Sequence, residues 1–520
     1  MKCALRKVQA ASCAGLLAAA AGGCNSLIGL EVGETDPAGT GAGAPPSTSS
    51  SSAGGDDGAG AGGGDGAGGG GGAPACNQAE PDAVVAPRGL WGDTIGDDVR
   101  HIAAVDGAVT AVVNEGASLT VARWSASGAR EPEYTLSVPG VSGMHVAVGA
   151  GVVYVAGEST GSATLPSSQR SGCGIGPPSG HSERPSFVAA LDAAGRCSWA
   201  WSIDGDGGTA ARGLAATSDV IAVAVETLGK GKTFGPCALR ADVPERFTLV
   251  AAFKPAGGAC AWHRELGARE AVTVRALAGS AEAGAGVVAV VGDYDAANGA
   301  VSLGGDTPVT SESRGLFVAR YTSRDGAPQA VTTLKLGGAP RVAPHGAALL
   351  RGGDVAIAGN YAGTFDFQDT CPRMPDAGAT DNFFVARVSG DHVVWSRGFG
   401  DATTDQTAAG VAADDAGAVY VTGLFTGEID LGAAGKLEAS AGKQAGFLIK
   451  LDAEGNLVSA SKLEAGGAAD LRAVAADSSS GAVYAAGSLT GILDLGLDLG
   501  QLGSAVDGPR GFITGLSSAR

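Results

Sequence analysis

Basic side chains recur at one place in a repeated pattern of this 520-residue chain. They stand one or two residues before short runs of small apolar residues, and the set is His101, His145, Arg212, Arg275, His345 and Arg472. If the runs surround a common axis, these side chains converge, and converging arginines bind carboxylate or sulfate groups through paired hydrogen bonds. The sequence therefore predicts an anion-binding ring. The alternative is that each basic group pairs with a nearby acid, such as Asp98 or Asp470.

The alignment of this ring leaves one question open. Arg212 stands two residues before its apolar run, and Ala409 holds the equivalent place in a copy that lacks a basic group. His101 and His145 fall one residue closer to their runs, unless the residues that follow them align with Gly213.

Four cysteines occupy matching positions in two successive copies of the pattern. Cys197 and Cys260 each precede a tryptophan by two residues, and Cys173 and Cys237 each lie in the long connection before them. This equivalence predicts the disulfides Cys173–Cys197 and Cys237–Cys260 in an exported chain, where disulfides persist. Each long connection must then fold over the outer edge of its sheet.

Two further cysteines have no such match. Cys371 lies in the corresponding connection of a later copy, and Cys76 is the cysteine left for it, so the pairing of these two stays open. Because the chain has no C-x-x-C spacing, we expect no zinc and no other metal at the cysteines.

A second recurring position carries short oxygen-bearing side chains: Thr164, Thr233, Ser302, Asp366, Asp430 and Asp494. Carboxylates are hard oxygen ligands, so calcium is one interpretation of the acidic members and of the segment 204–208. Hydrogen bonding to turn backbone explains better why Asp, Thr and Ser interchange there. We therefore expect no cofactor, with calcium as the alternative.

Motifs of catalysis are absent from the sequence. The chain has six histidines, and none of them belongs to a GxSxG, HExxH or phosphate-loop pattern. We therefore expect a protein that is not an enzyme. Because repeated sheets can assemble catalytic groups from several copies, an enzyme acting on polysaccharide at the ring of basic groups is the alternative.

The elements that must position these residues are short strands of four types, repeated seven times in fixed order. The first type holds the small apolar runs, as in 411–413, and the second reads Val-Tyr-Val, as in 419–421. The third begins with an aromatic or apolar residue, as in 384–388. The fourth is marked by a tryptophan or its substitute: Trp91, Tyr134, Trp199, Trp262, Thr332, Trp395 and Ser459. Such a sheet cannot bury both faces alone, which is why repeats of this length indicate a propeller or a solenoid.

The chain ends decide between these two architectures. The first strand, around Trp91, is of the fourth type, and the last, 512–516, is of the third type. A ring pairs the two and removes both free sheet edges. We therefore predict an all-β fold, a seven-bladed β-propeller of four-stranded blades over residues 86–520, closed by the N-terminal strand joining the C-terminal blade.

Two segments of this region resemble a known family. The strings 447–455, FLIKLDAEG, and 411–423, VAADDAGAVYVTG, are similar to repeats of the bacterial β-propeller repeat family. The resemblance covers nearly all of 91–516 and implies the propeller fold, without a catalytic signature to transfer. Thr332, Ser459 and Ala418 depart from the family's pattern.

The N-terminal 80 residues have the composition of a targeting segment followed by a flexible tether. Residues 1–23 have a basic start and a short apolar stretch, and small residues precede Cys24. This resembles the lipobox of bacterial lipoproteins, except for Ala21 where leucine is preferred, and implies lipidation of Cys24 with a plain secretory signal as the alternative. Residues 24–80, rich in Gly, Ala and Ser, predict a flexible linker.

The charge composition restricts the classes of partner that the chain is expected to bind. The net charge of −18 repels phosphate backbones, so nucleic acid is disfavoured. We expect a monomer of the bacterial cell envelope, lipid-anchored at the outer membrane, in the periplasm or exposed at the cell surface, with the lipid as its sole membrane attachment. It is expected to bind or scaffold a surface protein or glycan through its loop-rich face, and a structural envelope protein without a discrete ligand is a further alternative. An active site would bring carboxyl groups with displaced pKa values to the basic ring, whereas a binding platform would not.

Overall fold

The computed structural model describes residues 89–517, apart from gaps at 168–172, 177–183, 206–207, 228–230, 240–246, 268–270, 281–285, 298, 306–307, 311–313, 337–340, 366, 368–373, 496–500 and 505–507. All described residues belong to one unit, Gly71–Arg520. The predicted signal segment, Cys24 and the linker lie outside the described residues, as do Cys76 and Cys371.

Seven sheets hold a four-strand blade each, with the strands in chain order from the inner to the outer edge except in the last. Blade 1 consists of β2 (Asp98–Val105), β3 (Ala108–Glu115), β4 (Ser118–Ser125) and β5 (Arg130–Pro139). Blade 2 consists of β6 (Val141–Gly149), β7 (Val152–Ser159), β10 (Ser186–Leu191) and β11 (Cys197–Gly205). Blade 3 consists of β12 (Thr209–Ala216), β13 (Ile221–Thr227), β16 (Phe247–Phe253) and β17 (Cys260–Leu266). Blade 4 consists of β18 (Val272–Gly279), β19 (Val287–Asp295), β20 (Arg314–Thr322) and β21 (Pro328–Lys335).

The remaining blades follow the same order. Blade 5 consists of β22 (Arg341–Leu349), β23 (Val355–Ala362), β24 (Asn382–Ser389) and β25 (His392–Phe399). Blade 6 consists of β26 (Gln406–Ala413), β27 (Val419–Thr426), β30 (Gln444–Leu451) and β31 (Leu457–Leu463). Blade 7 consists of β32 (Ala469–Asp477), β33 (Ala482–Leu489), β36 (Arg510–Ser517) and β1 (Gly89–Thr94).

Within the described ranges, small extra hairpins lengthen the connection from the second to the third strand in four blades. They are β8 (Ala163–Thr164) with β9 (Gly174–Ile175), β14 (Gly231–Phe234) with β15 (Cys237–Ala238), β28 (Glu428–Asp430) with β29 (Lys436–Glu438), and β34 (Gly491–Asp494) with β35 (Gln501–Ser504). A single 3-10 turn, η1 (Gly432–Ala434), lies between β28 and β29. Among the described residues, no helix has the length and apolar character that a membrane crossing requires.

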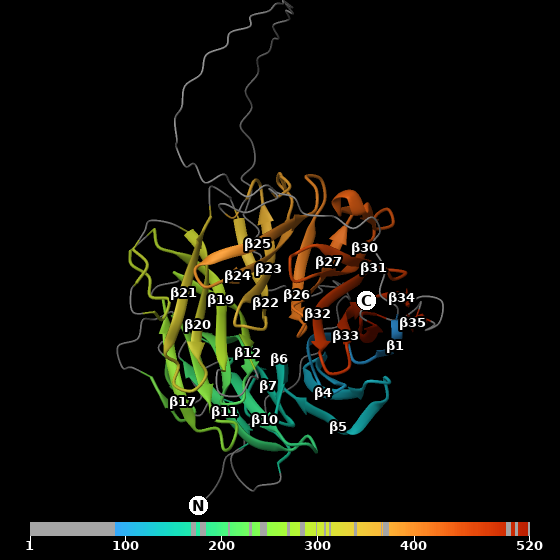
Figure 1. Cartoon of the computed structure of the whole chain (residues 1–520). Helices are drawn as coiled ribbons and strands as arrows, with labels where there is room; N and C mark the ends of the chain where they lie inside the picture. The colour runs from blue at the N-terminus through green and yellow to red at the C-terminus, as the bar shows by residue number, and fades with distance from the viewer. Residues whose placement is uncertain are drawn as a thin grey trace, which may run out of the picture. The chain divides into compact units, whose positions relative to one another are not determined.

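The N-terminal strand closes the ring. β1 pairs antiparallel with β36, from the end of the chain, and Thr514 Oγ1 donates a hydrogen bond of 2.7 Å to the Trp91 carbonyl. The inner strands contact one another in the cyclic order β2, β6, β12, β18, β22, β26, β32 and back to β2. Figure 1 shows the same closure, with the blue β1 beside the red strands of blade 7. The chain is a seven-bladed β-propeller.

Packing between blades explains the composition of the middle strands. β16 is buried along its whole length, and β3 is buried except at its last two residues, because both faces of these strands meet a neighbouring blade. One core cluster, for example, joins Ala222 and Val250 of blade 3 to Val288 and Phe317 of blade 4. Because aromatic residues make up 5% of the chain, this core is built mainly from Val, Ala, Leu and Ile.

The outer-strand tryptophans connect neighbouring blades by hydrogen bonds. Each indole Nε1 donates to a carbonyl in the turn between the third and fourth strands of the next blade: Trp91 to Ala126, Trp199 to Pro255, Trp262 to Ser323 and Trp395 to Ala453, at 2.8–3.0 Å. In blade 4 the Thr332 hydroxyl donates to Gly390 in the same way. The sequence pattern of the fourth strand therefore marks a contact between blades.

Candidate functional site

Every inner strand carries a β-bulge at the same place. The extra, unpaired residues are Arg100, Met144, Arg212, Arg275, His345, Ala409 and Arg472. A bulge turns the side chain of its extra residue away from the regular alternation, which is how sheets aim functional groups. Four of the six predicted ring residues occupy this bulge.

The two remaining histidines stand one residue beyond it. His101 and His145 are the first paired residues after their bulges, as Gly213 is in blade 3, so they do not share the position of Arg212. Arg100 holds that position in blade 1 and is not among the predicted ring residues. Alignment on apolar runs could not find Arg100, because the adjacent His101 was the more conspicuous residue and the bulge leaves no sign in the run itself.

Each arginine of the bulge position pairs with a carboxylate. Arg212 donates through Nε and Nη2 to Glu226 Oε2 at 2.9 and 2.5 Å, and Arg275 Nε donates to Asp293 Oδ2 at 2.8 Å. Glu226 and Asp293 hold the same register position in their second strands. These two pairs are therefore local to blades 3 and 4.

The other two arginines share acids across the blade 7–blade 1 junction. Arg472 Nη1 donates to both carboxylate oxygens of Asp98 at 2.8 Å, and its Nε donates to Asp470 at 2.5 Å. Arg100 also forms an ion pair with Asp98. Four guanidinium groups thus face four carboxylates.

The three histidines add no charge at neutral pH. Burial lowers the pKa of His101 to about 4 and that of His145 to about 3, where nearby His101 also contributes. Burial, assisted by Arg275, lowers the pKa of His345 to about 4. The rings of His101 and His145 lie edge to face, with centroids 5.5 Å apart. The predicted anion ring stays a prediction, and the geometry favours the alternative of local pairing.

Two carboxyl groups beside these arginines have raised pKa values. Burial raises the pKa of Asp470, although Arg472 acts against the shift. Burial also raises the pKa of Glu158, which holds the register position of Glu226 in blade 2 and is influenced by Arg184 and Arg212. Glu158 is not among the residues predicted from the sequence, although its position in the second strand matches that of Glu226.

The acidic turn position is occupied by hydrogen bonds within the chain. Asp430 accepts a hydrogen bond from the Gly432 N–H at 2.9 Å, and Ser302 accepts one from the Gly304 N–H at 3.4 Å. In both cases the side-chain oxygen, of an aspartate or of a serine, accepts a hydrogen bond from the N–H two residues later. This agrees with the turn interpretation. Asp366 lies outside the described residues, as does the side chain of Asp204.

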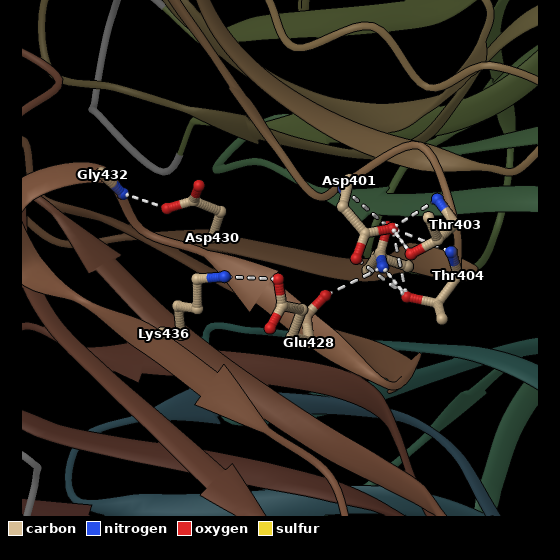
Figure 2. A network of polar contacts seen from close by, with 8 residues as sticks. Asp401, Thr403, Thr404, Glu428, Asp430, Gly432 and Lys436 are labelled. Carbon is tan, nitrogen blue, oxygen red and sulfur yellow. Dashed lines mark hydrogen bonds and ion pairs between the residues drawn. The ribbon is translucent and has the colours of Figure 1, made fainter.

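A denser network lies next to this turn. Asp401 accepts hydrogen bonds from the N–H groups of Thr403 and Thr404, at 2.7 and 2.8 Å, and from both hydroxyls. Figure 2 shows these groups around one carboxylate, while Glu428 pairs with Lys436 nearby. Although burial acts to raise it, these donors hold the pKa of Asp401 below its usual value. Because the Asp401 carboxylate accepts hydrogen bonds from the N–H and hydroxyl groups of its own turn, the network accounts for the structure of this turn.

Both predicted disulfides are confirmed. Cys173 bonds to Cys197 and Cys237 to Cys260, with Cα–Cα distances of 6.1 and 5.2 Å. The long connection of blade 2 folds over the outer edge of its own sheet, where Ser167 pairs in parallel with Cys197. The connection of blade 3 reaches its own outer strand through the Cys237–Cys260 bond, and its strand β14 also pairs with the outer strand β11 of the preceding blade.

Comparison with known proteins adds distant structural likenesses. No protein-family model matches the sequence, and no curated protein matches it significantly. The structure is similar to quinohemoprotein alcohol dehydrogenase ADHIIG from Pseudomonas putida HK5, at 10% identity and a TM-score of 0.36, over 83% of this chain and 76% of that one. It is similar to Chaetomium thermophilum Raptor, at 9% identity and a TM-score of 0.42, over 84% of this chain and 29% of that one. The structure is also similar to a europium-containing methanol dehydrogenase, at 9% identity and a TM-score of 0.35, over 83% of this chain and 93% of that one. The blade assignment depends on the strand pairing alone.

Proposed function

We propose that this chain is a non-catalytic, lipid-anchored β-propeller of the bacterial cell envelope, a member of the bacterial β-propeller repeat family that binds or scaffolds a protein or glycan. The binding surface is the face where second strands connect to third strands. The observation that carries this proposal is the set of four extra hairpins on those connections. Loops on a rigid scaffold are where binding residues concentrate.

The charged groups of the same face support binding over catalysis. Its arginines are held by carboxylates within the chain, and its histidines are neutral at pH 7. These paired groups offer fixed hydrogen-bond donors and acceptors to a neutral partner. The two disulfides agree with an oxidising compartment, in keeping with export.

An enzyme acting on polysaccharide is the second candidate, favoured by the raised pKa values of Glu158 and Asp470 near the bulge arginines. Glycoside hydrolysis uses two carboxyl groups, one of them protonated. Arg472 donates to Asp470 and acts against the rise that burial causes in the pKa of this carboxyl group. Glu158 is therefore the better general-acid candidate of the two.

One experiment separates the candidates. The full chain is titrated with a neutral glucan, a polyuronate and a peptidoglycan fraction, and each mixture is then assayed for new reducing ends. We expect saturable binding to one of them without release of reducing ends. Lys436→Glu, on hairpin β28–β29, should weaken binding at least about tenfold through loss of a contact on this face. Arg351→Glu, an exposed residue in the turn between β22 and β23 on the opposite face, is the matched control.

The outcomes are distinct. Reducing-end release that disappears in Glu158→Gln would establish the enzyme candidate instead. Equal weakening by Lys436→Glu and Arg351→Glu would place binding elsewhere than on the hairpin face.

A further inference from the structure

Two cysteines and a histidine in blade 3 have ligand atoms close enough for one metal ion. The sulfurs of Cys237 and Cys260 and a ring nitrogen of His263 all lie within 4.8 Å of one another. Cys260 and His263 have a C-x-x-H spacing, which the sequence analysis overlooked when it disfavoured zinc. Thiolate and imidazole together are the ligands that zinc prefers.

A bulge in the outer strand brings these residues to one face. Ala252 pairs with Trp262 and the next residue, Phe253, pairs with Cys260, so Ala261 is an extra residue in β17. Residues three apart on a regular strand point to opposite faces, and one extra residue restores them to the same face. Hairpin β14–β15 then brings Cys237 over this edge.

The other disulfide among the described residues provides an internal comparison. Cys173 and Cys197 are 4% and 0% exposed, and Ala200 holds the position that His263 holds in blade 3. Cys260 and His263, in contrast, are partly exposed, although Cys237 is buried. Two matching disulfides therefore differ in access and in a potential nitrogen ligand.

A carboxylate stands beside the histidine. Glu265 Oε1 lies 4.0 Å from His263 Nε2. Carboxylates near an imidazole ligand orient the ring and raise its basicity in metal sites. The structure thus offers three ligands on an accessible edge, with the Glu265 carboxylate nearby but beyond hydrogen-bond distance of His263 Nε2.

We propose that Cys237, Cys260 and His263 form a zinc site that opens when their disulfide is reduced. A low-molecular-weight thiol supplies two electrons: the Sγ–Sγ bond breaks, both cysteines become thiols, and two molecules of the reductant join in a disulfide. Binding of Zn²⁺ then displaces the two thiol protons, and water takes the fourth ligand position. In the oxidised protein the sulfurs carry no thiolate, so the site is closed. This proposal does not depend on the proposed function.

Co²⁺ and Zn²⁺ test the site directly. The full chain is reduced, freed of reductant without oxygen and titrated with Co²⁺, whose bonds to thiolate give a near-ultraviolet charge-transfer band, and then with Zn²⁺ in competition with a chromophoric chelator. We expect the band in the reduced parent and none in the oxidised parent. His263→Ala should weaken Zn²⁺ binding by more than about tenfold.

Controls keep the result interpretable. His392→Ala removes an exposed histidine of blade 5 and should bind as the parent does. Cys173→Ser with Cys197→Ser should also retain the band, and near-ultraviolet circular dichroism verifies the fold of each variant. Binding that His263→Ala leaves unchanged, or that is lost with the Cys173–Cys197 pair instead, would overturn the proposal. If the double variant fails to fold, the His263→Ala comparison still decides.

Discussion

Arg472 in the last inner strand binds Asp98 in the first, at 2.8 Å to each carboxylate oxygen and 374 residues apart along the chain. Asp477, a few residues further on, accepts a hydrogen bond of 2.6 Å from the Gly107 N–H of blade 1. Together with the pairing of β1 and β36, these contacts connect the two ends of the ring. The junction between blades 7 and 1 is therefore held by polar contacts as well as by apolar packing.

Arg472→Ala should destabilise this junction. Removing the guanidinium takes the hydrogen-bonded cation from Asp470 and leaves Asp98 paired with Arg100 alone, which costs about 2 kcal/mol for partly buried groups. The urea midpoint of unfolding measures the change. Arg341→Ala, which removes an arginine that is 55% exposed and paired to Asp381, should cost less than about 0.5 kcal/mol. Similar losses in both variants would mean that the junction pair is energetically ordinary.

Removal of the closing strand tests the ring itself. A chain that begins at residue 98 lacks β1 and exposes the edge of β36 along with the partners of Trp91. We expect aggregation and loss of cooperative unfolding, because an unpaired edge strand recruits other chains. A chain that begins at residue 86 keeps β1 and should behave as the parent in size-exclusion chromatography and calorimetry. A stable monomer from the shorter chain would contradict the role of β1.

Two substitutions in blades 5 and 6 should show how much the contact between an outer-strand tryptophan and the turn of the next blade contributes to the free energy of unfolding. Trp395→Phe removes the donor to the Ala453 carbonyl and should cost about 1–2 kcal/mol. Gly455→Ala, at φ +83°, would place a methyl group against the Trp395 ring, 2.6 Å from its Cδ2. Its cost should exceed that of Gly352→Ala by about 1–3 kcal/mol.

Gly352 is a suitable control because it has φ +88° and no atom lies within 4 Å of the place that an alanine methyl group would take, so it reports the left-handed backbone alone. Equal midpoints for the two alanine variants in thermal unfolding would show that the ring of Trp395 moves aside freely.

The histidines near the bulge predict a loss of stability in mild acid. Their pKa values in the folded protein, about 3 to 4, lie below the ordinary 6.5, so the unfolded chain takes up protons first as the pH falls. The free energy of unfolding should decrease between about pH 6.5 and 4, by at most about 1.4 kcal/mol per pH unit for each histidine. The raised pKa values of Asp470 and Glu158 act in the opposite direction, so slopes are compared between variants.

His145→Gln combined with His345→Gln should flatten this dependence, measured as the urea midpoint against pH. His392→Gln, where the side chain is 66% exposed, is the control for loss of a surface histidine. A double variant with the parent slope would assign the acid sensitivity to other groups.

Fold prediction succeeded because its signals are local. Strands such as 419–421 and 447–451 are recognised by their apolar residues, and the turns between them by Asp and Gly. The order of strand types along the chain can therefore be predicted without knowing which residues far apart in the sequence are in contact. Ring closure followed from the unmatched strands at Trp91 and Phe512, since unpaired edges are unfavourable. The disulfides followed from equivalence of copies.

The sequence by itself thus determined the seven blades, their strand order, the closing strand and two cysteine pairs. Only the tertiary structure decided which residues share the bulge with Arg212, which acid each arginine binds, and that His263 meets Cys237 and Cys260. The physical reason is register. One extra residue in a strand reverses the face of every side chain beyond it, and this choice depends on packing between blades that are distant in the chain.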